Sequence, residues 1–533
     1  MEAINLKPNI DESPAEYADR LGIYYTSSVS DNHKKELGQF FTPIRIAQFM
    51  GSIINVRKDK LRILDPGCGI GILSASLCEE ISKSNLQIKS IELVAFETDV
   101  EILPFSDLCF THLSNWLKLK GIEFTYFLCK NDFILHNSKI LIEDIKKSNE
   151  RYDFIISNPP YFKLRKDDVR VVSVQGVIFG QTNIYSIFLL IAAKLLGKNG
   201  QMVFITPRSF CSGNYFRLFR ELFFDLIDIQ LVHLFDSRKD SFKRDSVLQE
   251  NIIISARKKN KEKKINNHEV LISSSKGISD LSKRQTRIYK WNDLININSY
   301  QKILHLPSSD IDENVINIFK TWTGSLKIYG LKISTGPVVD FRSVEFINFK
   351  KRKNRVPLIW LHNIESMNII WPKKSGQGKP KGQYILHNQK SESRLVKNKN
   401  YVLIRRFSTK EDSKRLIAAP YIKTNYAEVD MIGIENHLNY IYSINDELTN
   451  EEVYGIAAIL NSRLFDIYFR TFNGNINVSA TELRDFPLPN YELIKNLGRI
   501  ILASNNLTCL NVDNLIAEIF KLPENLYENY ENI

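Results

Sequence analysis

The four residues Asn158-Pro159-Pro160-Tyr161, which follow the apolar run at 154–156 and Ser157, suit methylation of a planar exocyclic amine. The lone pair of such an amine is delocalised into its ring, so a catalyst must draw the nitrogen toward tetrahedral geometry. The side-chain oxygen of Asn158 and the backbone carbonyl of Pro159 can each accept one amino hydrogen, which aims the lone pair at an electrophilic methyl group. The two prolines hold the loop open, and Tyr161 offers a ring on which an unstacked nucleobase can lie. A proline-rich turn is the alternative interpretation.

A glycine-rich loop lies upstream of this motif. Residues 61–64 predict a short buried strand, and Asp65-Pro66-Gly67-Cys68-Gly69-Ile70-Gly71 leads from it into a helical pattern. Glycines at alternate positions let the backbone approach a ligand closely at a helix N-terminus. Ile72 stands where a dinucleotide-binding loop has its last glycine, which argues against a nicotinamide cofactor. A tight turn packed under a helix is the other interpretation.

Two further apolar runs end in groups that suit an adenosyl cofactor. Residues 93–96 end at Glu97, whose carboxylate can hold the two ribose hydroxyls. Residues 124–128 lead to Asp132, which can accept from an adenine amino group, and to Phe133, which can pack on the adenine ring. Glu97 and Asp132, taken singly, are equally compatible with a helix cap or a solvated turn. Their occurrence in this order predicts a ligand site at the carboxyl ends of parallel strands.

These motifs, in this order, resemble those of the gamma-class N6-adenine DNA methyltransferases of bacterial type II restriction-modification systems, which use S-adenosyl-L-methionine. The family's first cofactor motif precedes the glycine loop, and Gly38-Gln39-Phe40-Phe41-Thr42-Pro43 occupies that place. The resemblance assigns Thr42 and Pro43 to the methionine end of the cofactor, Asp65, Gly67 and Gly69 to its pocket, Glu97 to its ribose, Asp132 and Phe133 to its adenine, and Asn158, Pro159, Pro160 and Tyr161 to the catalytic loop.

The resemblance also implies a second aromatic residue on the other face of the flipped base. Phe242, which precedes the strand pattern at 247–253, is our candidate for this stacking partner of Tyr161. Phe235 is the rival candidate. Either ring can instead belong to the hydrophobic core.

The resemblance predicts an α/β fold, a doubly wound class I S-adenosylmethionine-dependent methyltransferase sheet with a C-terminal α+β target-recognition domain. Further strands are predicted at 201–206, 227–235 and 248–254, after a helix at 185–196. We divide the chain into an N-terminal helical extension (1–36), a methyltransferase catalytic domain (37–288) and a target-recognition, DNA-binding domain (289–533).

The composition favours an intracellular enzyme that binds a polyanion. The chain has 533 residues, enough for two domains, and its net charge of +12 suits a nucleic acid with its phosphates. Six cysteines are scattered without paired spacing, so neither a disulfide framework nor a metal site is expected. The longest apolar stretch, 184–196, is too short to cross a bilayer, and the first residues are polar, so we expect no membrane association and a cytoplasmic location.

The second half carries basic and aromatic residues that suit DNA binding. Basic side chains gather at 350–355 and lie near Trp360 and Trp371, although a lysine-rich surface loop would look similar. Residues 401–407 alternate like a strand, and 453–469 have the spacing of one amphipathic helix. The arginines at 405 and 406 are candidates for guanine or phosphate contact, or for a structural role.

We therefore predict methylation of adenine N6 in a specific sequence of double-stranded DNA, with a cognate restriction endonuclease acting separately and the enzyme working as a monomer. The alternatives are methylation of cytosine N4, of RNA or of a protein glutamine amide, and a binding module without catalysis.

Overall fold

The computed structural model describes residues 6–30, 41–142, 151–177, 182–235, 250–260, 267–296, 299–373, 381–408, 412–426, 429–474, 476–504, 511–523 and 526–527. The chain divides into two compact units, Met1–Ser308 and Ser309–Ile533. Within the described ranges, no helix combines the length and the apolar character needed to span a lipid bilayer.

The first unit is built on a sheet with the strand order β3-β2-β1-β4-β5-β7-β6-β8-β9. β1 is parallel to β2 and β4, β2 is parallel to β3, and β4 is parallel to β5, whereas β7 runs antiparallel between β5 and β6. The strands are β1 (Lys60–Asp65), β2 (Ser90–Phe96), β3 (Glu123–Cys129), β4 (Tyr152–Ser157), β5 (Leu196–Pro207), β6 (Ile227–Phe235), β7 (Asn251–Lys258), β8 (Glu269–Ser275) and β9 (Gln285–Lys290).

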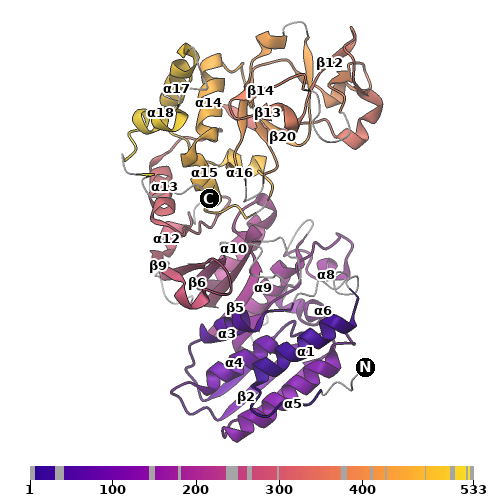
Figure 1. The fold of residues 1–533 in the computed structure, drawn as a ribbon, viewed down its shortest axis with the longest axis vertical. Helices are drawn as coiled ribbons and strands as arrows, with labels where there is room; N and C mark the ends of the chain where they lie inside the picture. Colours follow the sequence, from indigo (N-terminus) through magenta and orange to yellow (C-terminus); the bar gives the residue numbers. More distant parts are fainter. Residues whose placement is uncertain are drawn as a thin grey trace. The chain divides into compact units, whose positions relative to one another are not determined.

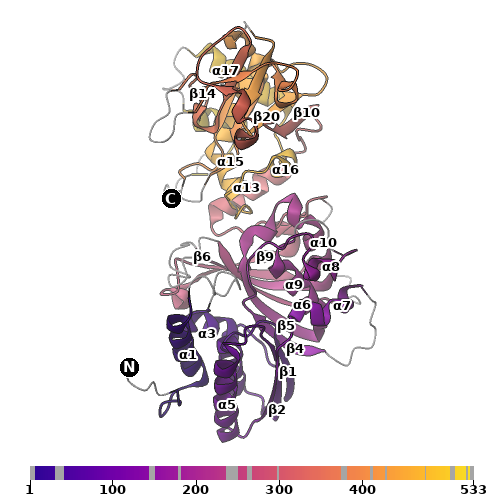
Figure 2. The ribbon, with the colours of Figure 1, turned by 90° about the vertical axis from the view of Figure 1, so that its right-hand side faces the viewer.

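Helices cover both faces of this sheet, as predicted for a doubly wound fold (Figure 2). One hydrophobic core joins the sheet to α1 (Pro14–Ser28), α3 (Ile44–Ser52), α4 (Ile72–Ser82) and α5 (Leu103–Leu119). A second core joins the other face to α6 (Phe133–Asn137), α7 (Lys139–Ile142), α9 (Ile184–Leu195) and α10 (Arg217–Leu226). The short elements α8 (Val169–Val172), α12 (Trp291–Leu294), η1 (Arg208–Cys211), η2 (Asn214–Phe216) and η3 (Leu281–Lys283) complete the unit.

Burial on both faces explains why the central strands are apolar runs in the sequence. In β1, Ile63 packs in the core of α1 and α4 while its neighbour Leu64 packs in the core of α9. Neighbouring side chains at the centre of the strand are therefore both hydrophobic, which is typical of parallel strands covered by helices on both sides. The predicted α/β class and its strands are confirmed.

The unit boundaries differ from the predicted segments. Helix α1 packs against α4 and α5 and belongs to the first compact unit, so it does not form a separate extension. The predicted boundary after residue 288 falls within β9, and α12 follows it inside the same unit. The roles that we assigned to the two domains stay predictions.

The second unit mixes helices with largely antiparallel sheets, so its predicted α+β class is confirmed (Figure 1). Its sheets have the orders β10-β20-β17-β18, β11-β15-β12-β19-β16 and β13-β14. The strands are β10 (Leu331–Thr335), β11 (Ile347–Asn348), β12 (Arg355–Ile359), β13 (Ile364–Glu365), β14 (Asn368–Ile369), β15 (Tyr384–Leu386), β16 (Val396–Lys397), β17 (Tyr401–Arg405), β18 (Ala418–Tyr421), β19 (Met431–Ile434) and β20 (Leu438–Ser443). The helices are α13 (Asp310–Thr321), α14 (Asn450–Asn461), α15 (Arg463–Arg470), α16 (Ala480–Arg484), α17 (Tyr491–Ala503) and α18 (Val512–Ile519), with 3-10 turns η4 (Asp340–Arg342), η5 (Val344–Phe346), η6 (Leu361–Asn363), η7 (Glu392–Arg394) and η8 (Lys423–Tyr426).

One expectation about the second unit needs correction, and the arginines at 405 and 406 follow the structural alternative. The single helix predicted at 453–469 is broken into α14 and α15, because the Ser462 side chain caps the second helix by accepting from the N–H of Phe465 at 3.3 Å. The two adjacent arginines bind main-chain carbonyls. Arg405 Nε donates to Ile364 at 2.8 Å and Arg406 Nη1 donates to Asn436 at 3.0 Å, so both guanidinium groups have structural partners.

Candidate active site

A cavity of about 300 Å³ lies at the carboxyl ends of the parallel strands. Such a position is where ligands bind in open α/β sheets. The wall of this cavity contains many of the residues that the sequence singled out, namely Gly67, Gly69, Glu97, Asp132, Phe133, Asn158 and Pro160.

The glycine loop between β1 and α4 needs its glycines for two different reasons. Gly69 and Gly71 have positive φ values of 52° and 99°, which residues with a Cβ rarely adopt. A Cβ on Gly71 would also lie 2.5 Å from Cε1 of Phe110 on α5. The loop is tied to the end of β2, since the N–H of Cys68 donates to the carbonyl of Phe96 at 2.9 Å.

Glu97 holds the glycine loop against the end of β2. Its carboxylate accepts from the N–H groups of Gly69 at 3.0 Å, Thr98 at 2.7 Å and Asp99 at 2.8 Å. Burial raises the pKa of Glu97 above its ordinary value, while these backbone donors act in the opposite direction. Oε1 already has two donors and Oε2 has one, so Oε2 retains the capacity to accept from a ligand hydroxyl.

Asp132 is both a helix cap and a wall of the cavity. Its Oδ1 accepts from the N–H of Leu135 at 3.0 Å, which begins α6. Its Oδ2 lies 3.9 Å from Nη1 of Arg170, a wall residue that the sequence did not indicate. Arg170 is held by Asp168, with Nη2 2.7 Å from Oδ2, and this pairing lowers the pKa of Asp168. Asp132 is therefore a helix cap, and its contact with a cofactor adenine stays a prediction.

Asp65 lies beneath the cavity rather than on its wall. The side chain is fully buried and accepts from Oγ of Ser74 at 2.7 Å, which fixes the first turn of α4 to the end of β1. Burial raises the pKa of Asp65 to about 7, while the bonds from Ser74 and the backbone of Gly67 oppose that shift. Asp65 thus supports the glycine loop from below.

Thr42 contacts the loop that was predicted to be catalytic. Pro43 precedes the first residue of α3, and the hydroxyl of Thr42 accepts from Nδ2 of Asn158 at 3.1 Å. The predicted cofactor motif and the predicted catalytic motif are therefore brought into direct contact. Neither Thr42 nor Pro43 is among the residues that line the 300 Å³ cavity.

Tyr161 does not present the exposed ring that we predicted. The side chain is only 7% exposed, and its hydroxyl donates to the carbonyl of Ile205 at 3.0 Å and to Oδ1 of Asn158. Burial raises its pKa well above the ordinary value. The ring lies edge-on to Tyr185 within the core, and Phe162 rather than Tyr161 lines the cavity. Stacking of a base on Tyr161 stays a prediction and requires the ring to leave this position.

The position of the second stacking aromatic stays a prediction. Phe242 lies outside the described residues. The rival Phe235 is buried at the end of β6, edge-on to His233 with ring centroids 4.7 Å apart, and it packs in the core of α1 and α4. Among the described residues, no group of three or more His, Cys, Asp or Glu side chains is placed to hold a metal ion.

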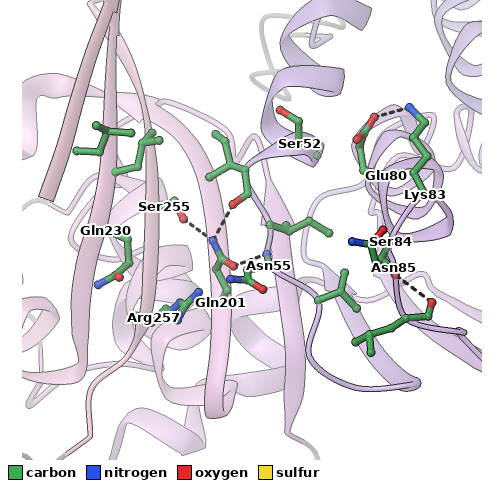
Figure 3. Close-up of a pocket in the computed structure, with 17 residues that line it drawn as sticks. Ser52, Asn55, Glu80, Lys83, Ser84, Asn85, Gln201, Gln230, Ser255 and Arg257 are labelled. Atoms are coloured by element: carbon green, nitrogen blue, oxygen red, sulfur yellow. Dashed lines mark hydrogen bonds and ion pairs between the residues drawn. The ribbon is translucent and has the colours of Figure 1, made fainter. Parts of the chain in front are cut away.

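A larger hollow of about 620 Å³ contains none of the predicted site residues (Figure 3). Its wall includes the start of β5 and the segment that follows α3. Gln201 crosses it, donating from Nε2 to Ser255 Oγ at 2.8 Å and to the carbonyl of Ile53 at 3.2 Å, and accepting at Oε1 from the N–H of Asn55 at 3.1 Å. Because its central amide is satisfied within the fold, this hollow carries no chemistry that we can assign.

Comparison with known proteins identifies the family. The chain is 32% identical to the type II methyltransferase M.BsuBI of Bacillus subtilis over 91% of this chain and 94% of that protein. The chain belongs to the type II methyltransferases of restriction-modification systems. It is also 30% identical to the type II methyltransferase M.PstI of Providencia stuartii, over 89% of this chain and 90% of that protein.

Two further comparisons cover the chain in different ways. The family model for the Eco57I restriction-modification methylase matches residues 78–242. A solved structure, that of the type IIG restriction endonuclease BpuSI, is 13% identical with a TM-score of 0.44, over 97% of this type II methyltransferase and 68% of that protein.

Proposed function

We propose that this type II methyltransferase transfers a methyl group from S-adenosyl-L-methionine to N6 of adenine within a specific sequence of double-stranded DNA. The observation that carries the proposal is the position of Asn158, whose amide stands at the wall of a cavity that also contains Glu97 and Asp132. The amide that can accept a hydrogen from the target amine and the two carboxylates that suit an adenosyl group thus line the same cavity.

The cavity residues fit the cofactor by the chemistry of their donors and acceptors. Glu97 offers a carboxylate oxygen to the ribose, and Asp132 offers one to the adenine amino group. Phe133 and the glycines at 67 and 69 provide apolar and backbone surface around them. When bound there, the cofactor would supply an electrophilic methyl group on a sulfonium.

The catalytic loop then acts on the target amine without a strong base. Asn158 Oδ1 and the carbonyl oxygen of Pro159 each accept one amino hydrogen, which localises the lone pair on nitrogen. Thr42 fixes which end of the Asn158 amide faces the amine, because its hydroxyl already accepts from Nδ2. Oδ1 of Asn158 also accepts from the hydroxyl of Tyr161 in the free chain, and its second lone pair is left for the amino hydrogen.

The second unit is proposed to bind the DNA and recognise its sequence. The methyl group is proposed to protect that sequence from cleavage by a separate restriction endonuclease. The family membership and the net charge of +12 support DNA as the partner. We also propose that the enzyme is a monomer that works in the cytoplasm.

Replacement of the catalytic amide tests the proposal. Asn158→Ala should lower methyl incorporation from labelled S-adenosyl-L-methionine into DNA by about a hundredfold or more, the usual scale for losing one preorganised transition-state hydrogen bond. Its affinity for the cofactor should change little. Asn85→Ala, at an exposed asparagine away from the cavity, is the control. Digestion of the DNA to nucleosides should yield N6-methyladenine, and N4-methylcytosine or full activity of Asn158→Ala would refute the proposal.

A further inference from the structure

Buried polar atoms without hydrogen-bond partners gather around the catalytic loop. Among the described residues they include Oγ of Ser157 at the end of β4, Oγ1 of Thr206 near the end of β5, and Oγ1 of Thr182 and Oδ1 of Asn183 before α9. Asn251, the first residue of β7, adds both Nδ2 and Oδ1. Proteins satisfy nearly all buried polar atoms, so such a gathering marks a place where a ligand completes the bonding.

Asn251 stands out because both ends of its amide are unsatisfied. Its side chain is only 4% exposed, yet within the described part of the chain neither amide atom has a hydrogen-bond partner. Asn439 in the second unit is equally buried but fully used, since its Nδ2 donates to the carbonyl of Val478 and its Oδ1 accepts from Thr335 Oγ1, both at 2.9 Å. Burying an unpaired amide costs free energy, so the stability of the fold does not explain why an asparagine stands at position 251.

The strand register places Asn251 on the same side of the sheet as the catalytic amide. Ile205 pairs with Ile253, and two residues further toward the carboxyl edge Pro207 pairs with Asn251. Side chains alternate along a strand, so Asn251 shares the face of Ile253, which packs in the core of α1 and α4. Asn158 contacts Thr42, two residues before the α3 helix that covers this same face.

A buried ion pair fixes the start of β7 beside the end of β5. Nη1 of Arg208 lies 3.7 Å from Oε2 of Glu250, and the N–H of Arg208 donates to the carbonyl of Glu250 at 2.7 Å. Both side chains are buried. The ion pair of Glu250 and the pairing of β7 with β5 therefore fix the backbone of Asn251. A side chain that recognises a ligand needs such a fixed backbone.

We propose that Asn251 reads the edge of the target base once the base has left the DNA helix. This inference rests on the proposed function. The two amino hydrogens of adenine are accepted by Asn158 and Pro159, so the part of the edge left to recognise is a ring nitrogen, which is an acceptor. Nδ2 of Asn251 supplies the matching donor. The amide is covered in the free chain, so this bond forms only as the base enters.

A chemical double-mutant cycle tests this contact. The methylated site is first mapped with the wild-type enzyme. Duplexes that contain this site are then prepared with adenine, 1-deazaadenine or 7-deazaadenine at the target position. On adenine, Asn251→Ala should lose about tenfold to a hundredfold in kcat/KM, the scale of one good base-edge contact. On one of the two deaza duplexes the kcat/KM of the wild-type enzyme should fall by a similar factor relative to adenine. The kcat/KM of Asn251→Ala should be the same on that duplex as on the adenine duplex.

Thermal unfolding separates this role from a structural one. Asn439→Ala orphans its partners and should lower the Tm, whereas Asn251→Ala orphans none among the described residues and should not lower the Tm. The inference is overturned if Asn251→Ala methylates like the wild type, if both proteins lose equally on the deaza duplexes, or if the wild type tolerates both analogues. The comparison of the wild-type enzyme on adenine and on the two analogues needs no variant. If the wild type methylates no adenine, the proposed function fails and takes this inference with it.

Discussion

Replacing Glu97 by glutamine should weaken cofactor binding without unfolding the chain. The carboxylate accepts three backbone N–H bonds, from Gly69, Thr98 and Asp99, and retains acceptor capacity at Oε2 for a ribose hydroxyl. A glutamine can place its oxygen toward Thr98 and Asp99. Its NH₂ group then faces the N–H of Gly69, so a donor meets a donor and the acceptor for the ribose is lost.

The size of the effect follows from the charge of the acceptor. A hydrogen bond to a charged group contributes about 1.5–3 kcal/mol. Each 1.4 kcal/mol is a factor of ten in affinity, so we expect the Kd to rise by about tenfold to about 150-fold. Loosening of the glycine loop adds to this loss rather than offsetting it.

Isothermal titration with S-adenosylhomocysteine measures this affinity without turnover. Glu92→Gln is the matched control, because Glu92 lies on β2, which ends one residue before Glu97, and it binds Arg62 at 2.8 Å on a partly exposed surface. Its Kd should stay within about twofold of the wild type, since such surface pairs contribute little. A wild-type Kd for Glu97→Gln, with an unchanged circular dichroism spectrum, would refute the assignment of Glu97 to the ribose.

Two further substitutions test the support of the glycine loop. Gly71→Ala should lower the free energy of unfolding by about 2–4 kcal/mol, because it combines positive-φ strain with a clash against Phe110, whereas Gly121→Ala, at a φ of 74° with open space around it, should lose only about 1 kcal/mol in the same urea titration. Equal losses would contradict the packing argument. The pKa of Asp65 is raised from 3.8 to about 7 by burial, so folding favours its protonated form, and the resulting stability is lost as the pH rises through that range. Asp65→Asn should therefore gain stability relative to the wild type with rising pH, by up to about 4 kcal/mol by pH 8, and a difference that does not change with pH would show that Asp65 is not the titrating group.

The strands that deliver the site could be predicted because each is an apolar run that ends in a distinctive loop. The runs at 61–64, 93–96, 124–128 and 153–156 lie within β1, β2, β3 and β4. Burial keeps β1 and β4 mostly apolar, whereas the edge strand β3 is recognisable by its aromatic residues, so the end of each run is visible in the sequence. The helical spacing predicted at 453–469 is present but is divided between α14 and α15, since Ser462 caps the second helix.

Side-chain placement could not be predicted where it depends on distant partners. Arg170 lines the cavity, yet its sequence neighbourhood shows only an ordinary pairing with Asp168. The sequence identifies Tyr161 as aromatic but does not reveal that the carbonyl of Ile205, on another strand, holds its hydroxyl inside the core. The unsatisfied amide of Asn251 is likewise a property of the surrounding fold.

The bond between Thr42 and Asn158 gives a physical reason for two motifs that stand 116 residues apart in the chain. An amide has a donor end and an acceptor end of nearly equal shape, and only the acceptor end can draw a hydrogen from the target amine. Because the Thr42 hydroxyl accepts from Nδ2, the amide is oriented with Oδ1 away from Thr42, where the hydroxyl of Tyr161 also finds it. Oδ1 can accept a second hydrogen bond, so under the proposed function the target amine would bind there while the orientation set by Thr42 stays in place.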